Sequence, residues 1–106
     1  MNIQEYLELK QKLFKKSDEI SILKSKSYSN IVDDPFKNVK MSSLIHVKPA
    51  KGILIRLLDK ISRIDTYVDG NGIDLKDEKF EDCIIDAINY LTMVYAIVIG
   101  QQNDST

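Results

Sequence analysis

Hydrophobic residues recur at helical spacing in three segments of the chain, and this pattern predicts an all-α fold. In residues 3 to 26 they form one stripe, made of Ile3, Tyr6, Leu7, Leu13, Phe14, Ile20 and Leu23. Ser17 and Asp18 fall inside this segment, so the alternative to one continuous helix is a bend or a break there. A second helix is expected from Pro49, a residue favoured in a first helical turn, to the glycine-containing turn at residues 69 to 72. Its stripe is regular and consists of Ile53, Leu54, Leu57, Leu58, Ile61, Ile64 and Val68.

The last helix is expected from about Asp77 to Ile99, with Gly100 ending it. Between the first two helices, residues 27 to 49 are rich in Ser, Asn and Asp and contain Pro35. This composition predicts an ordered loop with one short helical piece over residues 38 to 44. No segment alternates between polar and apolar residues as a half-buried strand does. We therefore expect a small helical bundle in which residues 1 to 100 form one domain and residues 101 to 106 a disordered tail.

The last helix is apolar on nearly all sides, which indicates assembly into a homo-oligomer. Tyr90, Met93, Val94 and Ile97 extend its apolar surface, and a domain of this size can hardly cover every side of such a helix. The apolar run at residues 87 to 100 is shorter than the roughly 20 residues that span a bilayer. The prediction is a buried or interface helix, without a membrane partner.

Composition narrows the function classes only slightly. The chain has 106 residues, 15 basic and 16 acidic side chains and a net charge of −1, so no overall field favours nucleic acid. Cys83 is the only cysteine, which excludes a disulfide framework and suits a cytoplasmic location. The charged N-terminus does not resemble a signal peptide. Cys83 is expected to be a small buried hydrophobe, and the lone His46 a surface or loop residue rather than a ligand.

Two polar stripes carry the candidate chemistry. The second helix presents Arg56, Asp59, Lys60 and Arg63 at spacings of one, three and four residues, and the last presents Glu78, Asp82, Asp86 and Asn89. A short connection between these helices favours antiparallel packing, which would let the two stripes approach each other. Carboxylates on one stripe could hold Mg²⁺, and arginine or lysine on the other could hold phosphates. The alternative is a network of salt bridges between the helices with no ligand.

The same residues resemble a known family. The spacing R-x2-D-K-x2-R at residues 56 to 63, followed by D-E-x2-E-D-x3-D-x2-N-Y at residues 77 to 90, is similar to the nucleotide modification associated domain family of phages and bacteria. That family in turn resembles the MazG-like all-α nucleotide pyrophosphohydrolases. The loop SYSNIVDDPFKN, residues 27 to 38, is similar to a tyrosine-containing segment of the family. The resemblance implies an oligomeric helical protein that binds or hydrolyses nucleotides.

The resemblance also carries specific residues over. MazG-like enzymes hold Mg²⁺ with an E-x2-E pair and an E-x2-D pair on two helices, and the last aspartate falls on Asp86, followed by Tyr90 four positions later. Its partner glutamate falls on Cys83, with Asp82 beside it, while the first pair falls on Arg56 and Asp59. Two of the four expected acids are therefore replaced.

These replacements leave two hypotheses. In the first, the protein is a Mg²⁺-dependent nucleotide pyrophosphohydrolase with Asp59, Asp82 and Asp86 as catalytic acids and Glu78 as a further metal ligand. In the second, it is a non-catalytic phage-type protein in the host cytoplasm that sequesters a signalling nucleotide. Under either hypothesis the expected nucleotide-binding residues are Arg56, Lys60, Arg63, Asn89, Tyr28 and Phe36. Tyr28 and Phe36 would stack on the base, although anchoring the loop to the core is the simpler role for them.

Overall fold

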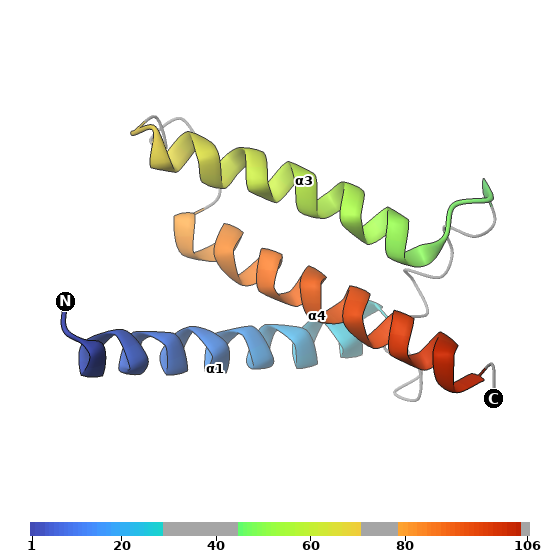
Figure 1. Cartoon of the computed structure of the whole chain (residues 1–106), viewed down its shortest axis with the longest axis horizontal. Helices are drawn as coiled ribbons and strands as arrows, with labels where there is room; N and C mark the ends of the chain where they lie inside the picture. Colours follow the sequence, from blue (N-terminus) through green and yellow to red (C-terminus); the bar gives the residue numbers. More distant parts are fainter. Residues whose placement is uncertain (29–44, 71–78, 105–106) are drawn as a thin grey trace.

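The computed structural model describes residues 1–28, 45–70 and 79–104, which form three α-helices and contain no strand (Figure 1). These are α1 (Ile3–Tyr28), α3 (Pro49–Val68) and α4 (Phe80–Asp104). The expected all-α class is confirmed, and α1 and α3 begin where the hydrophobic pattern predicts. The short helical piece predicted over residues 38 to 44 lies outside the described residues.

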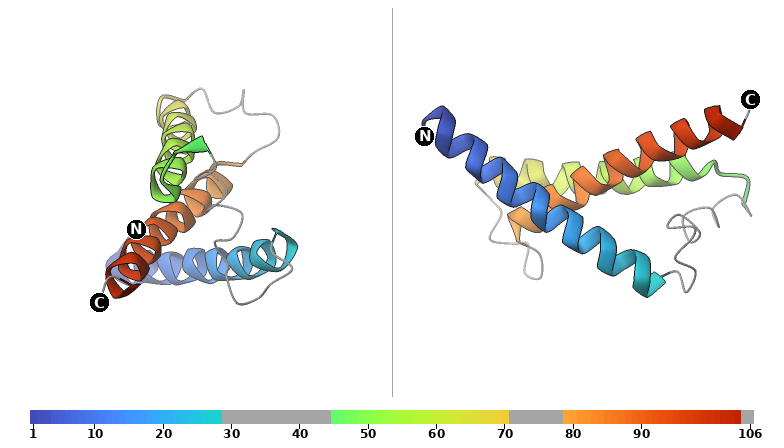
Figure 2. Two further views of the ribbon diagram at one scale, coloured as in Figure 1. Left: turned by 90° about the vertical axis from the view of Figure 1, so that its right-hand side faces the viewer. Right: turned by 90° about the horizontal axis from the view of Figure 1, so that it is seen from below.

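Helix α4 is the central element and lies between the other two. It packs antiparallel against α3 along most of its length, while α1 crosses it on another side (Figures 1 and 2). The first half of α1 extends beyond the crossing, so its apolar residues Ile3 and Tyr6 remain at least half exposed. In the described part of the chain, α1, α3 and α4 therefore form an open arrangement in which α4 packs against both other helices.

The helix ends show where local sequence signals succeed and where they fail. Pro49 occupies the first turn of α3, and the helix stops after Val68 because Gly70 adopts a positive φ of 84° and donates its N–H to the Tyr67 carbonyl. Gly100 does not end α4, which continues to Asp104. A glycine costs only about 1 kcal/mol inside a helix, so it stops one only where a left-handed turn is itself stabilised.

Helix α1 is continuous through Ser17 and Asp18 and neither bends nor breaks there. Its start is capped by Asn2, whose Oδ1 accepts a hydrogen bond from the Glu5 backbone N–H at 2.8 Å. Ser17 is tolerated within the helix because its hydroxyl has a specific partner on α4. The predicted alternative of a bend is thus wrong, since a tertiary hydrogen bond satisfies the serine.

Among the described residues the buried hydrophobic core is small. It consists of Ile53 and Leu57 of α3 and Cys83, Ile85 and Ile97 of α4. Cys83 is fully buried, as the sequence predicts. The ring of Tyr67 packs near that of Phe80, with centroids 5.0 Å apart, and closes the end of this core where α3 stops and α4 begins.

Much of the predicted hydrophobic stripe of α3 does not face this core. Leu58, Ile61 and Val68 are 65%, 49% and 73% exposed, although they repeat as regularly as the buried positions. On α4 the residues predicted to form oligomer contacts behave in the opposite way, because Ile97 is buried and Tyr90, Met93 and Val94 are half-buried within the protomer. The exposed apolar side of α4 carries Leu91, Tyr95 and Val98 instead.

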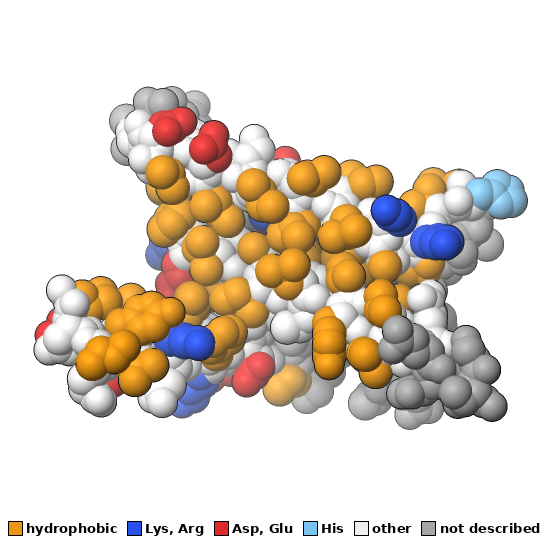
Figure 3. All heavy atoms as spheres, in the orientation of Figure 1, with side chains coloured by type: hydrophobic (Ala, Val, Ile, Leu, Met, Phe, Trp, Pro, Cys, Tyr) orange, Lys and Arg blue, Asp and Glu red, His pale blue; other side chains and the backbone are white. Residues whose placement is uncertain are grey.

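Hydrophobic side chains cover a broad area over both α3 and α4 on one face of the molecule (Figure 3). In the described part of the chain one segment, Phe80–Gln101, has the length and composition of a membrane-crossing helix, and only 17% of its most apolar window is buried. Helix α4 is longer than the apolar run at residues 87 to 100, because its first two turns also include Glu81, Asp82 and Asp86. The apolar surface over α3 and α4 is therefore not covered by the other described parts of the chain.

Candidate functional site

Within the described residues, the predicted polar stripes of α3 and α4 meet at the contact of Lys60 with Asp86. Lys60 Nζ lies 2.9 Å from Asp86 Oδ2, and the two side chains are only 14% and 16% exposed. Lys60 lies on the side of α3 that also buries Leu57, three residues earlier, so its stem packs along the core while its ammonium group reaches the carboxylate. Asp86 is held opposite it by the antiparallel packing of α4. The charge that the sequence places within an apolar helix is thus neutralised across the interface.

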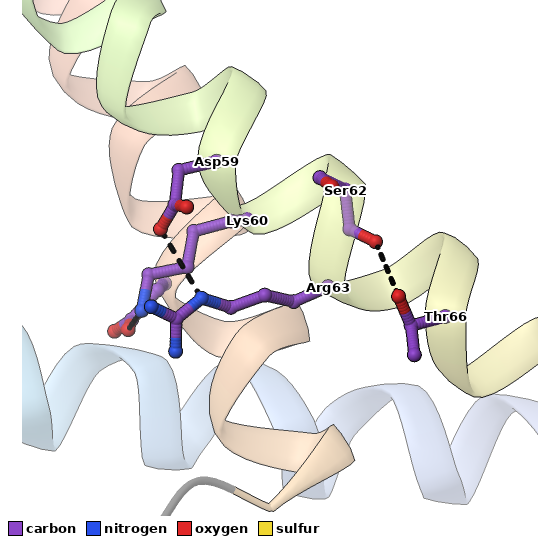
Figure 4. A network of polar contacts seen from close by, with 6 residues as sticks. Asp59, Lys60, Ser62, Arg63 and Thr66 are labelled. Carbon is purple, nitrogen blue, oxygen red and sulfur yellow. Dashed lines mark hydrogen bonds and ion pairs between the residues drawn. The ribbon is translucent and has the colours of Figure 1, made fainter. Parts of the chain in front are cut away.

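Beside this pair, α3 carries two further residues of the site. Arg63 Nε donates to Asp59 Oδ2 at 3.2 Å, four residues apart on the same helix, with side chains that are 40% and 60% exposed. Figure 4 shows the side chains of Asp59, Lys60 and Arg63 extending toward one another from α3. Arg56, one turn before Lys60, is exposed, and within the described chain it makes no ion pair or hydrogen bond through its side chain.

The acidic residues of α4 contact two neighbouring helices, and Glu81, which lies outside the predicted stripe, contacts α1. Glu81 Oε1 contacts Lys16 Nζ of α1 at 2.8 Å, and both side chains are about half exposed. The hydrogen bond and charge of Glu81, followed by the charges of Asp82 and Glu19, raise the pKa of Lys16 above its ordinary value. Asp82 is exposed, and its charge is among those that raise the pKa of Lys16 on α1. The acidic residues of α4 are therefore stabilised by lysines of two helices, Asp86 by Lys60 of α3 and Glu81 by Lys16 of α1.

Asn89 belongs to the contact with α1 and not to the contact with the α3 cations. Its Oδ1 accepts hydrogen bonds from Ser17 Oγ at 2.5 Å and from Ser21 Oγ at 3.0 Å. Asn89 is 8% exposed, and its Nδ2 has no hydrogen-bond partner in the part of the chain that the structure describes. The side chain supports the packing of α1 on α4, which is the hydrogen-bonded role that a buried amide requires.

Ser17, Ser21 and Lys16 are the polar partners that the sequence did not single out. The sequence does contain one indication of the two serines, because Ser17 and Ser21 are four residues apart on the apolar side of α1. What the sequence did not contain was the register of α1 on α4. That register decides which buried amide the two hydroxyls meet.

The remaining predicted residues are not brought into this site. Phe36, Glu78 and the side chain of Tyr28 lie outside the described residues, so their roles stay predictions. His46 is exposed just before α3, with a positive φ of 63°. Among residues 1–28, 45–70 and 79–104 no group of three or more His, Cys, Asp and Glu side chains could hold a metal ion.

The donor set does not fit the Mg²⁺ site that the resemblance implies. Asp59 is paired with Arg63 and Asp86 is paired with Lys60. A metal bound by these carboxylates would have to displace both resident cations. We therefore derive no catalytic step through a metal.

Comparison with protein-family models, with curated proteins and with solved structures finds no match to this chain. The family resemblance accordingly stays a prediction that rests on the motif residues themselves.

Proposed function

We propose that the protein is a nucleotide-binding protein that holds its ligand without hydrolysing it, on the surface formed by Arg56, Lys60 and Arg63 of α3. The observation that carries this proposal is the pairing of Asp86 with Lys60 and of Asp59 with Arg63. The acids that a hydrolase would use for Mg²⁺ already serve as partners for the basic residues. A role in sequestering a signalling nucleotide is consistent with such a site.

The charge balance of this surface supports phosphate binding. Three cations and two carboxylates leave one net positive charge, and Arg56 is exposed with its guanidinium available. A guanidinium can hold two phosphate oxygens at once, and these charge-assisted bonds are stronger than neutral ones. Arg63 is half exposed and one further turn along the helix from Lys60, so a polyphosphate could contact it while its pair with Asp59 loosens.

The resemblance to MazG-like proteins supplies the class of ligand. It adds Tyr28 and Phe36 as stacking partners for the base, and it is compatible with a homo-oligomeric assembly. Both expectations belong to the proposal rather than to the described structure.

The test is a binding and turnover assay with a panel of linear and cyclic nucleotides. The purified chain is incubated with each nucleotide in Mg²⁺ and in EDTA, and both the solution and the heat-released ligand are separated by chromatography. We expect one nucleotide to leave solution and return unchanged on heating, equally in Mg²⁺ and in EDTA. Monophosphate and pyrophosphate appearing only with Mg²⁺ would establish the hydrolase instead, and no depletion of any nucleotide would leave the residues as a salt-bridge network.

A matched pair of variants locates the ligand. Arg56→Gln should weaken binding about 10-fold to 100-fold, because a charge-assisted hydrogen bond contributes roughly 1.5–3 kcal/mol. Lys12→Gln removes the same charge from an exposed position on α1 and should leave the affinity unchanged. Equal losses in the two variants would indicate a general charge effect and would contradict a site at Arg56.

A further inference from the structure

Helix α3 carries a second row of helix-packing positions beside the row that contacts α4. The positions alternate in steps of three and four residues and are all exposed; they are Lys51, Leu54, Leu58, Ile61, Asp65 and Val68. We call this row the exposed seam of α3. Such alternation is the heptad spacing of a helix that packs against another helix. Ile53 and Leu57, which belong to the row that packs on α4, are likewise four residues apart and are buried.

The exposed side of α4 lies next to this seam. With about 100° per residue, Leu91, Tyr95 and Val98 fall on one side of α4, roughly a quarter-turn from the residues that face α3. Because α3 and α4 are antiparallel, the same quarter-turn puts the exposed seam on the same side of the pair. Figure 3 shows hydrophobic side chains extending over both helices on one face. Arg56 and Arg63 point to the other side of α3.

The apolar surface left open extends over both helices. Leu58, Ile61 and Val68 of α3 and Leu91 and Tyr95 of α4 are between 49% and 73% exposed. Large exposed apolar patches on a folded protein mark interaction sites. One further helical layer would cover this patch.

The charges at the ends of the seam indicate what this layer is. Lys51 and Asp65 lie seven residues before and seven residues after Leu58, and neither has an ion-pair partner in the described ranges. In Figure 3, basic side chains gather at the beginning of α3 and acidic ones at its end. An antiparallel copy of the same helix would place each lysine beside an aspartate of the other copy. The seam is thus complementary to itself.

We propose that a second copy of this chain packs on the exposed seam, α3 antiparallel to α3, with the two-fold axis near Leu58. Lys51 of each copy then lies next to Asp65 of the other, and Leu91 and Tyr95 of the two α4 helices extend the apolar contact. The interface is isologous, so it closes as a dimer. It leaves Arg56 and Arg63 on the outside, and the proposal does not depend on nucleotide binding.

Sedimentation equilibrium over a range of protein concentrations tests the seam. The full chain should sediment at twice its mass of 12.1 kDa. Leu58→Glu should weaken dimerisation about 100-fold or more, because it buries a charge at the centre of both halves of the interface. The control Leu23→Glu changes a leucine with nearly the same exposure, 64% against 65%, on the side of α1 that faces away from α4, and should leave the dimer intact.

A charge exchange tests the antiparallel register and uses only exposed residues, so it is independent of any folding defect in Leu58→Glu. Lys51→Glu alone and Asp65→Lys alone should each weaken the dimer about 10-fold, since both symmetry-related contacts become repulsive. The combination of the two should restore the affinity of the unmodified chain. Failure of the combination to recover would overturn the α3-to-α3 arrangement.

A monomeric mass at every concentration would overturn the proposal outright, as would equal effects of Leu58→Glu and Leu23→Glu. Flotation with vesicles of phosphatidylcholine and phosphatidylglycerol then identifies the competing occupant. A monomeric chain that binds these vesicles through Leu58 and Tyr95 would show that the face meets a lipid surface. A dimeric chain that does not bind them supports the second copy.

Discussion

Lys60 and Asp86 face each other across the α3–α4 interface at 2.9 Å, each less than one-fifth exposed. The sequence predicts the approach of these two residues but assigns Asp86 to metal or ligand chemistry. Partial burial changes that assignment, because a carboxylate with little access to water depends on its cation for stability. Asp86 therefore contributes to the fold itself, whatever ligand the neighbouring arginines hold.

Removing one partner of this pair should destabilise the protein. Asp86→Asn and Lys60→Met should each cost about 2–3 kcal/mol of unfolding free energy, because each leaves the other charge largely desolvated and unpaired. The combination of Asp86→Asn and Lys60→Met should cost less than the sum of the two single changes, because it removes both charges. Urea unfolding followed by circular dichroism measures all three. A double variant as unstable as the sum of the single ones would show that the two residues act independently.

The serine and asparagine cluster between α1 and α4 should behave as a unit. Asn89→Ala should destabilise the protein by about 1–3 kcal/mol, because two hydroxyls lose a buried acceptor. The triple change Asn89→Leu, Ser17→Ala and Ser21→Ala replaces every member with an apolar group and should recover most of this loss. The amide exchange rates of α1 provide the check. Faster exchange confined to α1 is expected for Asn89→Ala, and uniform acceleration in all three helices would contradict a local role.

Alkaline pH should loosen the contact between Lys16 and Glu81. The folded-state pKa of Lys16 is raised, chiefly by its hydrogen bond to Glu81, so the pair contributes fully below the unfolded lysine pKa of about 10.4. Its contribution is lost as pH rises through the higher folded pKa. NMR titration of the Lys16 side chain should show the raised value, and Glu81→Gln should lower it. Lys12, exposed on the same helix, is the control; an equal response to Glu81→Gln at both lysines would contradict a specific pair.

Two glycines should respond in opposite ways to the same substitution. Gly100→Ala should stabilise the protein by about 0.5–1 kcal/mol, because Gly100 lies within α4 and an added Cβ meets nothing within 4 Å. Gly70→Ala should destabilise it by about 1–2 kcal/mol, because φ there is 84° and a side chain is strained in that conformation. Thermal unfolding at one fixed protein concentration measures both. Stabilisation by Gly70→Ala would contradict the described turn at the end of α3.

Local signals in the sequence determined most of the helical structure. Helix α3 is determined by its hydrophobic spacing, by Pro49 and by the turn at Gly70. Each of these signals acts over a few neighbouring residues and does not depend on packing against distant parts of the chain. The same spacing located α1 and identified Cys83 as buried. It could not divide the apolar positions of α3 into those that face α4 and those that remain exposed, since Leu57 and Leu58 are equally hydrophobic.

Tertiary packing decided the partners of the polar residues. The acidic residues of α4 are close together in sequence, yet Asp86 pairs with Lys60 of α3 and Glu81 with Lys16 of α1. Asn89 turns to Ser17 rather than to the α3 cations because α1 crosses α4 at that level. Side chains of neighbouring turns diverge around a helix by tens of degrees, so which helix each one meets depends on crossing angle and register. Those two quantities arise only when the three helices pack.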